Sequence, residues 1–387
     1  IRTYLRITRL VICREKETSA EYLYTTKVRK LVNMSAAPAH AKKVKLPNAE
    51  VGPGGPAYII AEIGGNFSSF AEGKALIDAA VGAGSDAVKI QTYKAHTVSS
   101  RKAMFSSDGM EFTGDASQFE MFVQYQIDDE VQAELYAYAD EQEIVLFSTP
   151  GHQSDVEALE SLGNCIYKIG SDDAVNLPLL REVARLQKPI LLSTGMCTLY
   201  EVGLAVDAVL GEGNDQLILL HCVTNYPAAP QSVNLHAMST LQQAYGLPTG
   251  YSDHVLGNEI CLAAVALGAC VIEKHFTLDK AADGPDHALS ATPDEWRLMV
   301  DGIRAVEQAL GDGVKRPTAT EKTTRINNRK SIVCLREIKA GEVIAIDAVD
   351  IKRPGYGIEP RHWQAVIGKT AQRDIPEDEV LSWDMLA

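Results

Sequence analysis

The feature that most constrains this chain is a repeated alternation of short apolar runs with amphipathic stretches, starting near residue 58. The apolar runs are rich in Ile, Val and Leu, and they predict strands buried on both faces of a parallel sheet. We expect strands at 58–62, 86–91, 144–149, 165–171, 189–194, 216–222, 248–253 and 270–275. We expect helices at 70–83, 128–141, 153–162, 177–187, 198–210, 235–245, 257–267 and 293–309.

Eight strand–helix units within about 250 residues predict an α/β fold, a closed (β/α)8 TIM barrel, over residues 50–311. The alternative is an open, doubly wound sheet. That fold seldom has so many equal units, and no G-x-G-x-x-G motif follows the first strand here. The closed barrel is therefore the preferred interpretation.

The C-terminal part of the chain is organised differently. Residues 312–330 are polar and predict a linker. Residues 331–387 predict a small β-rich domain, because 338–351 and 375–386 carry similar half-motifs, each with a Glu-Val pair followed by an Asp. So small a unit buries little core on its own, and we expect it to pack against another surface.

The first 49 residues stand apart in charge, with 11 Lys and Arg against three Glu. They show no sustained periodicity and predict an N-terminal extension that is disordered or not native. Met34 begins a run typical of an initiator region, so an upstream translated stretch or expression remnant is the preferred interpretation. An Arg-rich targeting peptide is the alternative.

The remaining chain is acidic, since the whole sequence has a net charge of -14 despite its basic start. Such a body does not attract nucleic acid through its overall field. No apolar run is long enough to predict a membrane span. The seven cysteines form no CxxC pair, which favours a reduced, cytoplasmic protein over a disulfide framework or a structural zinc site.

Polar residues gather at the carboxyl ends of the expected strands, where TIM barrels carry their reaction sites. Lys89 and Lys168 are suited to an anionic phosphate, and nearby hydroxyl groups could bind its oxygens. Either lysine could instead pair with a barrel carboxylate, and Lys168 could form a Schiff base. The hydroxyl-bearing candidates are Thr149, Ser171 and Ser193.

Two histidines, His254 and His275, end neighbouring expected strands and could bind a Mn²⁺-like or Zn²⁺ ion. Their spacing alone is weak support for such a site. Asp253 and Glu273 beside them could orient ligands or transfer protons. Cys222 is more readily explained as a small buried residue than as a nucleophile.

A series of barrel motifs, in this order, closely resembles the N-acetylneuraminate (sialic acid) synthase family. The C-terminal KSIV, IKAGE and KRPGYGI (352–358) resemble that family's antifreeze-like (SAF) domain, so the resemblance covers about 57–387. The barrel motifs include IIAEIGGN (59–66), DAVKIQ (86–91), FSTP (147–150), YKIGS (167–171), KPILLSTGM (188–196), HCVTNYPA (221–228), GYSDH (250–254), VIEKHFTLD (271–279) and GPDHALS (284–290).

The resemblance implies a condensation of phosphoenolpyruvate with the open-chain aldehyde of N-acetylmannosamine or its 6-phosphate, with C–O cleavage and a divalent metal, Mn²⁺ or Mg²⁺. It implies that His254 and His275 bind the metal and that the two lysines and three hydroxyl groups bind phosphoenolpyruvate. Arg353 would reach the sugar's acyl group in a partner subunit, in a domain-swapped homodimer. The residues implied in substrate positioning and proton transfer are Glu62, Gln91, Tyr226, Asp253 and Glu273.

The sequence also departs from the family pattern. Phe67 replaces the usual histidine after the first strand, so any contact of that imidazole is in doubt. Asp172 and Asp173 follow YKIGS where Gly-Glu is usual. These changes leave both lysines and both implied metal ligands in place, but they could shift the sugar preference.

Three other functions remain open from the sequence. A sister synthase would make legionaminate, pseudaminate or a deaminated (KDN-type) sialic acid. A metal-independent Schiff-base aldolase would use Lys168. A non-enzymatic role in ice or surface binding would follow only from the antifreeze-like resemblance.

Overall fold

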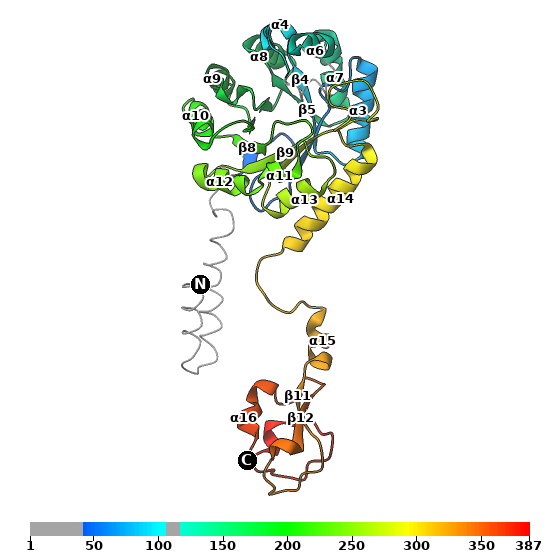
Figure 1. Ribbon diagram of the computed structural model, residues 1–387, viewed down its shortest axis with the longest axis vertical. Helices are drawn as coiled ribbons and strands as arrows, with labels where there is room; N and C mark the ends of the chain where they lie inside the picture. Colours follow the sequence, from blue (N-terminus) through cyan, green and yellow to red (C-terminus); the bar gives the residue numbers. More distant parts are fainter. Residues whose placement is uncertain (1–41, 106–116) are drawn as a thin grey trace. The chain divides into compact units, whose positions relative to one another are not determined.

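The computed structural model describes residues 42–105 and 117–387, and the chain divides into two compact units after Gly313 (Figure 1). The first unit is the predicted TIM barrel, closed in the order β10-β3-β4-β5-β6-β7-β8-β9. Its parallel strands are β3 (Tyr58–Glu62), β4 (Ala87–Thr92), β5 (Val145–Pro150), β6 (Tyr167–Ile169), β7 (Ile190–Ser193), β8 (Leu217–Cys222), β9 (Thr249–Asp253) and β10 (Val271–His275). Each strand lies within two residues of its predicted bounds.

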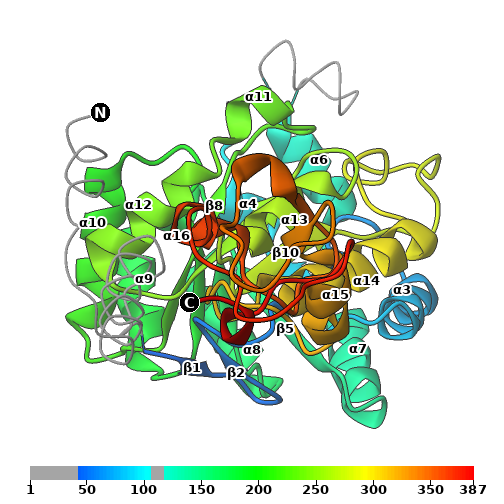
Figure 2. The ribbon, with the colours of Figure 1, turned by 90° about the horizontal axis from the view of Figure 1, so that it is seen from below.

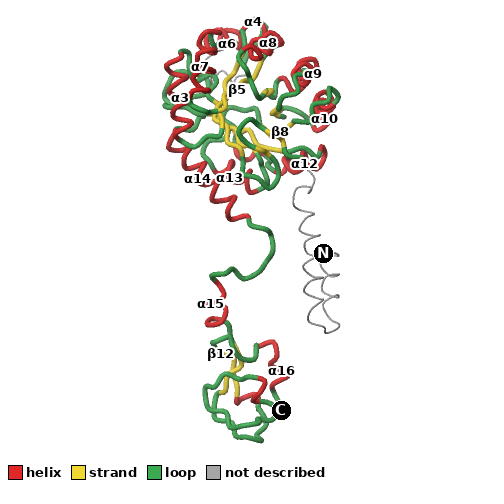
Figure 3. Tube along the Cα trace, turned by 180° about the vertical axis from the view of Figure 1, so that it is seen from behind, coloured by secondary structure: helices red, strands yellow, loops and turns green. Residues whose placement is uncertain are grey.

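Helices surround the strands, as Figure 3 shows in red around yellow. Three helix starts are encoded locally, because Ser69, Thr198 and Thr292 each form a capping box with the glutamate three residues later. The helices of this unit are α3 (Phe70–Gly82), α4 (Ala95–Val98), α6 (Gln118–Tyr125), α7 (Asp129–Glu141), α8 (Gln153–Ser161), α9 (Leu177–Arg185), α10 (Leu199–Leu210), α11 (Pro230–Val233), α12 (His236–Tyr245), α13 (Glu259–Ala266) and α14 (Pro293–Leu310), with a 3₁₀ turn at η1 (Asp173–Val175).

A small hairpin, β1 (Val44–Lys45) with β2 (Glu50–Val51), precedes the barrel (Figure 2). Val44 and Leu46 are buried in one cluster with residues from the starts of barrel strands. The hairpin therefore packs against the amino-terminal end of the barrel. The described chain thus joins the barrel before the boundary expected at residue 50, while the interpretation of residues 1–41 lies outside the described residues.

The second unit, from Val314, is built on the antiparallel pair β11 (Ser331–Cys334) and β12 (Val349–Lys352). The two half-motifs pair directly, because Ile338 and Ile375 exchange backbone hydrogen bonds of 2.9 and 2.8 Å. The segment expected as a linker contains a helix, α15 (Glu321–Asn328). The remaining elements are η2 (Ile346–Ala348), η3 (Pro360–His362), α16 (Trp363–Val366) and η4 (Trp383–Met385).

Candidate active site

Alternation along the strands decides which side chains enter the barrel. The inward residues of its amino-terminal half, such as Ile60, Phe147 and Leu220, belong to one apolar cluster. Two residues further along, the same face of each strand becomes mostly polar. The side chains in this inward register near the carboxyl ends are Glu62, Lys89, Gln91, Thr149, Lys168, Ser193, Cys222, Ser252, Glu273 and His275.

Two lysines and two glutamates form a buried charge cluster at this end of the barrel. Lys89 Nζ contacts Glu62 Oε2 and lies 3.8 Å from Glu273 Oε2, while Lys168 Nζ lies 3.5 Å from Glu273 Oε1. None of the four side chains is more than 6% exposed. The lysine–carboxylate pairing that the sequence left open is therefore present, and it holds both ammonium groups at one place.

Burial sets the charge states in this cluster. It lowers the pKa of Lys89 to about 7, although the nearby Glu273 carboxylate favours the charged ammonium. Burial alone would raise the pKa of Glu273, but Lys168 and Lys89 outweigh it and lower that pKa. Glu273 is consequently a stable anion, whereas Lys89 changes its charge near neutral pH.

The rings of His254 and His275 have centroids 5.4 Å apart and are tilted by 46° to each other, so one small ligand could reach both. His254 donates from Nδ1 to the Val223 carbonyl at 2.8 Å, so Nε2 is the nitrogen that carries the lone pair when the ring is neutral. Burial and the positive charge of His254 lower the pKa of His275 well below its usual value, which keeps that ring neutral. Tyr226 stacks on His254 at 4.1 Å.

The chemistry of these two rings fits a divalent ion, because neutral imidazole is a common ligand of transition metals. His275 Nδ1 is buried and makes no hydrogen bond to a described residue. However, the described part of the chain has no cluster of three or more His, Cys, Asp and Glu side chains suited to a metal. An ion here would therefore keep coordination positions for water or substrate.

The hydroxyl groups and Gln91 complete the same mouth of the barrel. Thr149 accepts a hydrogen bond from Lys89 at 3.2 Å, and Ser171 accepts one from the Gly195 amide at 3.0 Å. Ser193 Oγ is buried without a hydrogen bond to any described residue, so it is free to bind a ligand. The side chains of Gln91 and Glu62 both lie against Gly64. A Cβ at position 64 would be 2.4 Å from Glu62 Oε1 and 2.7 Å from Gln91 Cγ, so only glycine fits there.

Comparisons with known proteins show the family of this chain. The model of the NeuB family matches residues 76–315, and that of the SAF domain matches residues 329–387. The chain belongs to the NeuB family. It is 41% identical to the N,N'-diacetyllegionaminic acid synthase of Campylobacter jejuni, over 84% of this chain and 98% of that one. The corresponding enzyme of Legionella pneumophila is 39% identical, over 84% and 94%.

A solved structure also resembles this NeuB-family chain. The N-acetylneuraminic acid (sialic acid) synthetase of Leptospira borgpetersenii is 31% identical, and its TM-score is 0.64 over 73% of this chain and 95% of that one. The resemblance to sialic acid synthases that the motifs indicated is thus confirmed at the level of the family. Of these three proteins, the two legionaminic acid synthases have the higher identity to this chain.

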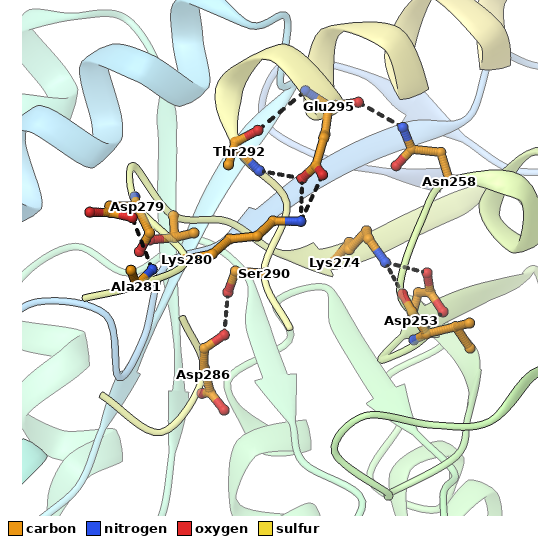
Figure 4. A network of polar contacts seen from close by, with 12 residues as sticks. Asp253, Asn258, Lys274, Asp279, Lys280, Ala281, Asp286, Ser290, Thr292 and Glu295 are labelled. Carbon is orange, nitrogen blue, oxygen red and sulfur yellow. Dashed lines mark hydrogen bonds and ion pairs between the residues drawn. The ribbon is translucent and has the colours of Figure 1, made fainter. Parts of the chain in front are cut away.

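The structure does not bring Asp253 into the barrel mouth with the other site residues of this NeuB enzyme. Asp253 follows the inward-facing Ser252, so its side chain points to the outer wall. There it accepts a hydrogen bond from Lys274 Nζ at 2.6 Å (Figure 4). It accepts another from the Tyr251 hydroxyl at 2.8 Å. The sequence indicated the strand end correctly but not the face of the strand.

Asp286 is a site residue that the sequence analysis missed. It lies in the loop after β10, and its Oδ2 is 3.5 Å from His275 Nδ1. Burial raises the pKa of Asp286 to about 6, against the attraction of His254 and Lys89. The only sequence signal for Asp286 was its place in the GPDHALS motif. In the structure, Asn66 donates a hydrogen bond to Ser290 at 3.0 Å, and Ser290 donates one to the Asp286 carbonyl, which holds the loop.

Two other sequence expectations concern residues that are not on the barrel strands. Phe67, which replaces the family's histidine, is buried in the hydrophobic core outside the barrel wall. Arg353 is an exposed residue of the second unit, and its contact with a sugar stays a prediction. In the described residues, no helix combines the length and apolar character needed to span a bilayer.

Proposed function

We propose that this NeuB-family enzyme condenses phosphoenolpyruvate with the open-chain aldehyde of an N-acylated amino sugar. The enol carbon forms a bond to the aldehyde carbon, water adds to the carbon that carries the phosphate, and inorganic phosphate leaves by C–O cleavage. The observation that carries this proposal is one barrel mouth with two buried lysines beside two buried imidazole rings.

The lysines are suited to bind the phosphate of phosphoenolpyruvate. Lys89 and Lys168 supply ammonium donors, and the hydroxyl groups of Thr149, Ser171 and Ser193 supply further donors around them. Glu273 remains anionic, so we infer that it positions the two lysines and does not donate a proton. Glu62, which contacts Lys89, is the carboxylate we propose for proton transfer.

The sugar would lie on the histidine side of the mouth. A divalent ion, Mn²⁺ or Mg²⁺, held by His254 and His275 would polarise the aldehyde carbonyl as a Lewis acid. Tyr226, stacked on His254, and Asp286, beside His275, would contact the sugar. Gln91 would also contact the sugar. In a domain-swapped homodimer, Arg353 of a second copy would bind the acyl group.

The relatives favour a diacetamido sugar as the acceptor. Both synthases at 39–41% identity make N,N'-diacetyllegionaminic acid by their names, whereas the sialic acid synthetase is 31% identical. We therefore place 2,4-diacetamido-2,4,6-trideoxymannose first. N-acetylmannosamine or its 6-phosphate, which the sequence analysis placed first, is the second candidate.

The test is phosphate release from phosphoenolpyruvate with a panel of sugars in the presence of Mn²⁺. We expect kcat/KM for the diacetamido sugar to exceed that for N-acetylmannosamine by about tenfold or more, because a missing contact to an acylamino group costs at least about 1.4 kcal/mol. A preference for N-acetylmannosamine or its 6-phosphate would move the assignment to sialic acid. No phosphate release with any hexosamine would contradict the proposed reaction.

The low pKa of Lys89 predicts a pH dependence of phosphoenolpyruvate binding. In the free enzyme, Lys89 is mostly a charged ammonium below pH 7 and mostly a neutral amine above pH 7. Above pH 7, binding of phosphoenolpyruvate must therefore be accompanied by protonation of Lys89. The KM for phosphoenolpyruvate should therefore rise about 50-fold from pH 7 to pH 9, a range above the second pKa of a phosphate ester.

The matched control is Lys89→Arg, since a guanidinium group keeps its charge over this whole range. We expect a much flatter KM profile for Lys89→Arg, whatever its absolute activity. If the KM for phosphoenolpyruvate of the wild-type enzyme does not change from pH 7 to pH 9, Lys89 is still protonated at pH 9, which would contradict the proposed charge state.

A further inference from the structure

A buried ion pair lies in the outer wall of the barrel, directly behind the two histidines. Lys274 Nζ is 2.6 Å from Asp253 Oδ2, and the two side chains are 2% and 0% exposed (Figure 4). The residues are also direct partners in the register between β9 and β10. Each one immediately precedes a histidine, so the pair joins the two strand ends from which His254 and His275 enter the site.

The pair also fixes the backbone on the other side of His254. Asp253 Oδ1 accepts the amide of Val255 at 3.0 Å, and Lys274 Nζ donates to the Val255 carbonyl. Both backbone polar groups of Val255, the residue that follows His254, are therefore held by the same pair. His254 is thus flanked by one member of the pair and by a residue that both members bind.

The carboxylate of Asp253 is fully occupied by these contacts. Besides Lys274 and Val255, it accepts hydrogen bonds from Tyr251 at 2.8 Å and from the Cys261 thiol at 3.2 Å. Lys274 lies in the same enclosed space, between the barrel wall and α13. Neither charged group has a free face toward a substrate, so a direct catalytic role does not follow from their position.

Stability alone does not explain the pair. Removing two charges from water is costly, and well-packed apolar residues often replace a buried ion pair without loss of stability. Apolar side chains, however, could not bind both polar groups of Val255. The distinctive result of the pair is geometric, because it sets the two strand ends and the turn after His254 relative to one another.

We propose that Asp253 and Lys274 are positioning residues that set the spacing of His254 and His275 for a divalent ion. The inference rests on the proposed ion site at these two histidines. Outer-shell contacts of metal ligands usually contribute 10–100-fold to metal affinity, so an effect of this size is expected although the contact here runs through the backbone.

The test compares Mn²⁺ affinity with stability in the full-length protein. The double variant D253N/K274M removes both charges with side chains of similar size, which avoids an uncompensated buried charge. We expect its urea unfolding midpoint to stay close to that of the wild type. We expect its Kd for Mn²⁺, from the electron paramagnetic resonance signal of the free ion, to rise about tenfold or more.

The matched control is K280M/E295Q, which removes another ion pair of 2.7 Å from the same region (Figure 4). That pair is about 40% exposed and binds neither histidine strand. Its variant should bind Mn²⁺ like the wild type. If D253N/K274M shows no cooperative unfolding, the isosteric variant D253N carries the test, with an expected loss of affinity of a few-fold.

The outcomes separate the two levels of the proposal. Unchanged Mn²⁺ affinity in a folded D253N/K274M variant would overturn the positioning role while leaving the ion site intact. If His254→Ala and His275→Ala bind Mn²⁺ as tightly as the wild type does, the proposed ion site is wrong, and the positioning role is wrong with it. Reduced affinity with retained stability would support the inference.

Discussion

Replacing His254 or His275 with alanine is expected to lower the kcat of phosphate release by about 10³-fold and to abolish high-affinity Mn²⁺ binding. Lewis-acid activation of a carbonyl contributes several kcal/mol, and about 4 kcal/mol corresponds to a factor of 10³. No third His, Cys, Asp or Glu in the described chain completes a metal cluster, so one remaining imidazole should not retain the ion.

The control for this prediction is His236→Ala, which removes an exposed imidazole at the start of α12. It should leave both kcat and Mn²⁺ affinity unchanged. Turnover should be measured as phosphate release over a range of Mn²⁺ concentrations, so that weak binding is distinguished from lost activity. Normal turnover of both active-site variants in EDTA would show that the two histidines do not hold a catalytic metal.

The barrel could be predicted almost completely from the sequence. Its strands are short and buried on both faces, and its helices have an apolar stripe, so the two periods alternate clearly along the chain. Because both faces of each strand are buried, the sequence does not show which of them points into the barrel. In GYSDH, Ser252 and Asp253 are adjacent polar residues, and only the register of the closed barrel shows that Asp253 points outward to Lys274.

Long-range contacts explain the other differences. Asp286 enters the site from a loop whose conformation depends on Asn66, more than 200 residues earlier in the chain. The helix α15 was not predicted because none of its residues is buried and it has no apolar stripe. By contrast, the lysines and histidines could be predicted, since they directly continue buried strands.

The low pKa of Lys89 also could not be foreseen from the sequence. It arises from complete burial next to a second lysine, and the two lysines come from different strands, β4 and β6. Glu273 reaches both of them from β10 across the barrel. A closed barrel brings these three strands to one mouth, so the charge balance of the site is a property of the fold.

Replacing Lys168 with methionine is expected to lower kcat/KM for phosphoenolpyruvate by about 10²–10³-fold. The variant loses charge-assisted hydrogen bonds to phosphate, at about 1.5–3 kcal/mol each, and Glu273 loses one of its two cationic partners. Lys168→Arg keeps the charge and should retain measurable activity. The measurement is phosphate release with the sugar held at saturation.

The same two variants distinguish the synthase from a Schiff-base aldolase. An imine requires a primary amine, so an aldolase would lose all activity in Lys168→Arg, and its wild-type form would be trapped on Lys168 by borohydride. The proposed synthase reaction has no covalent step at this lysine, because in that reaction its ammonium group binds phosphate. A borohydride adduct on Lys168, together with full activity of the wild type in EDTA, would therefore contradict both the phosphate site and the metal site.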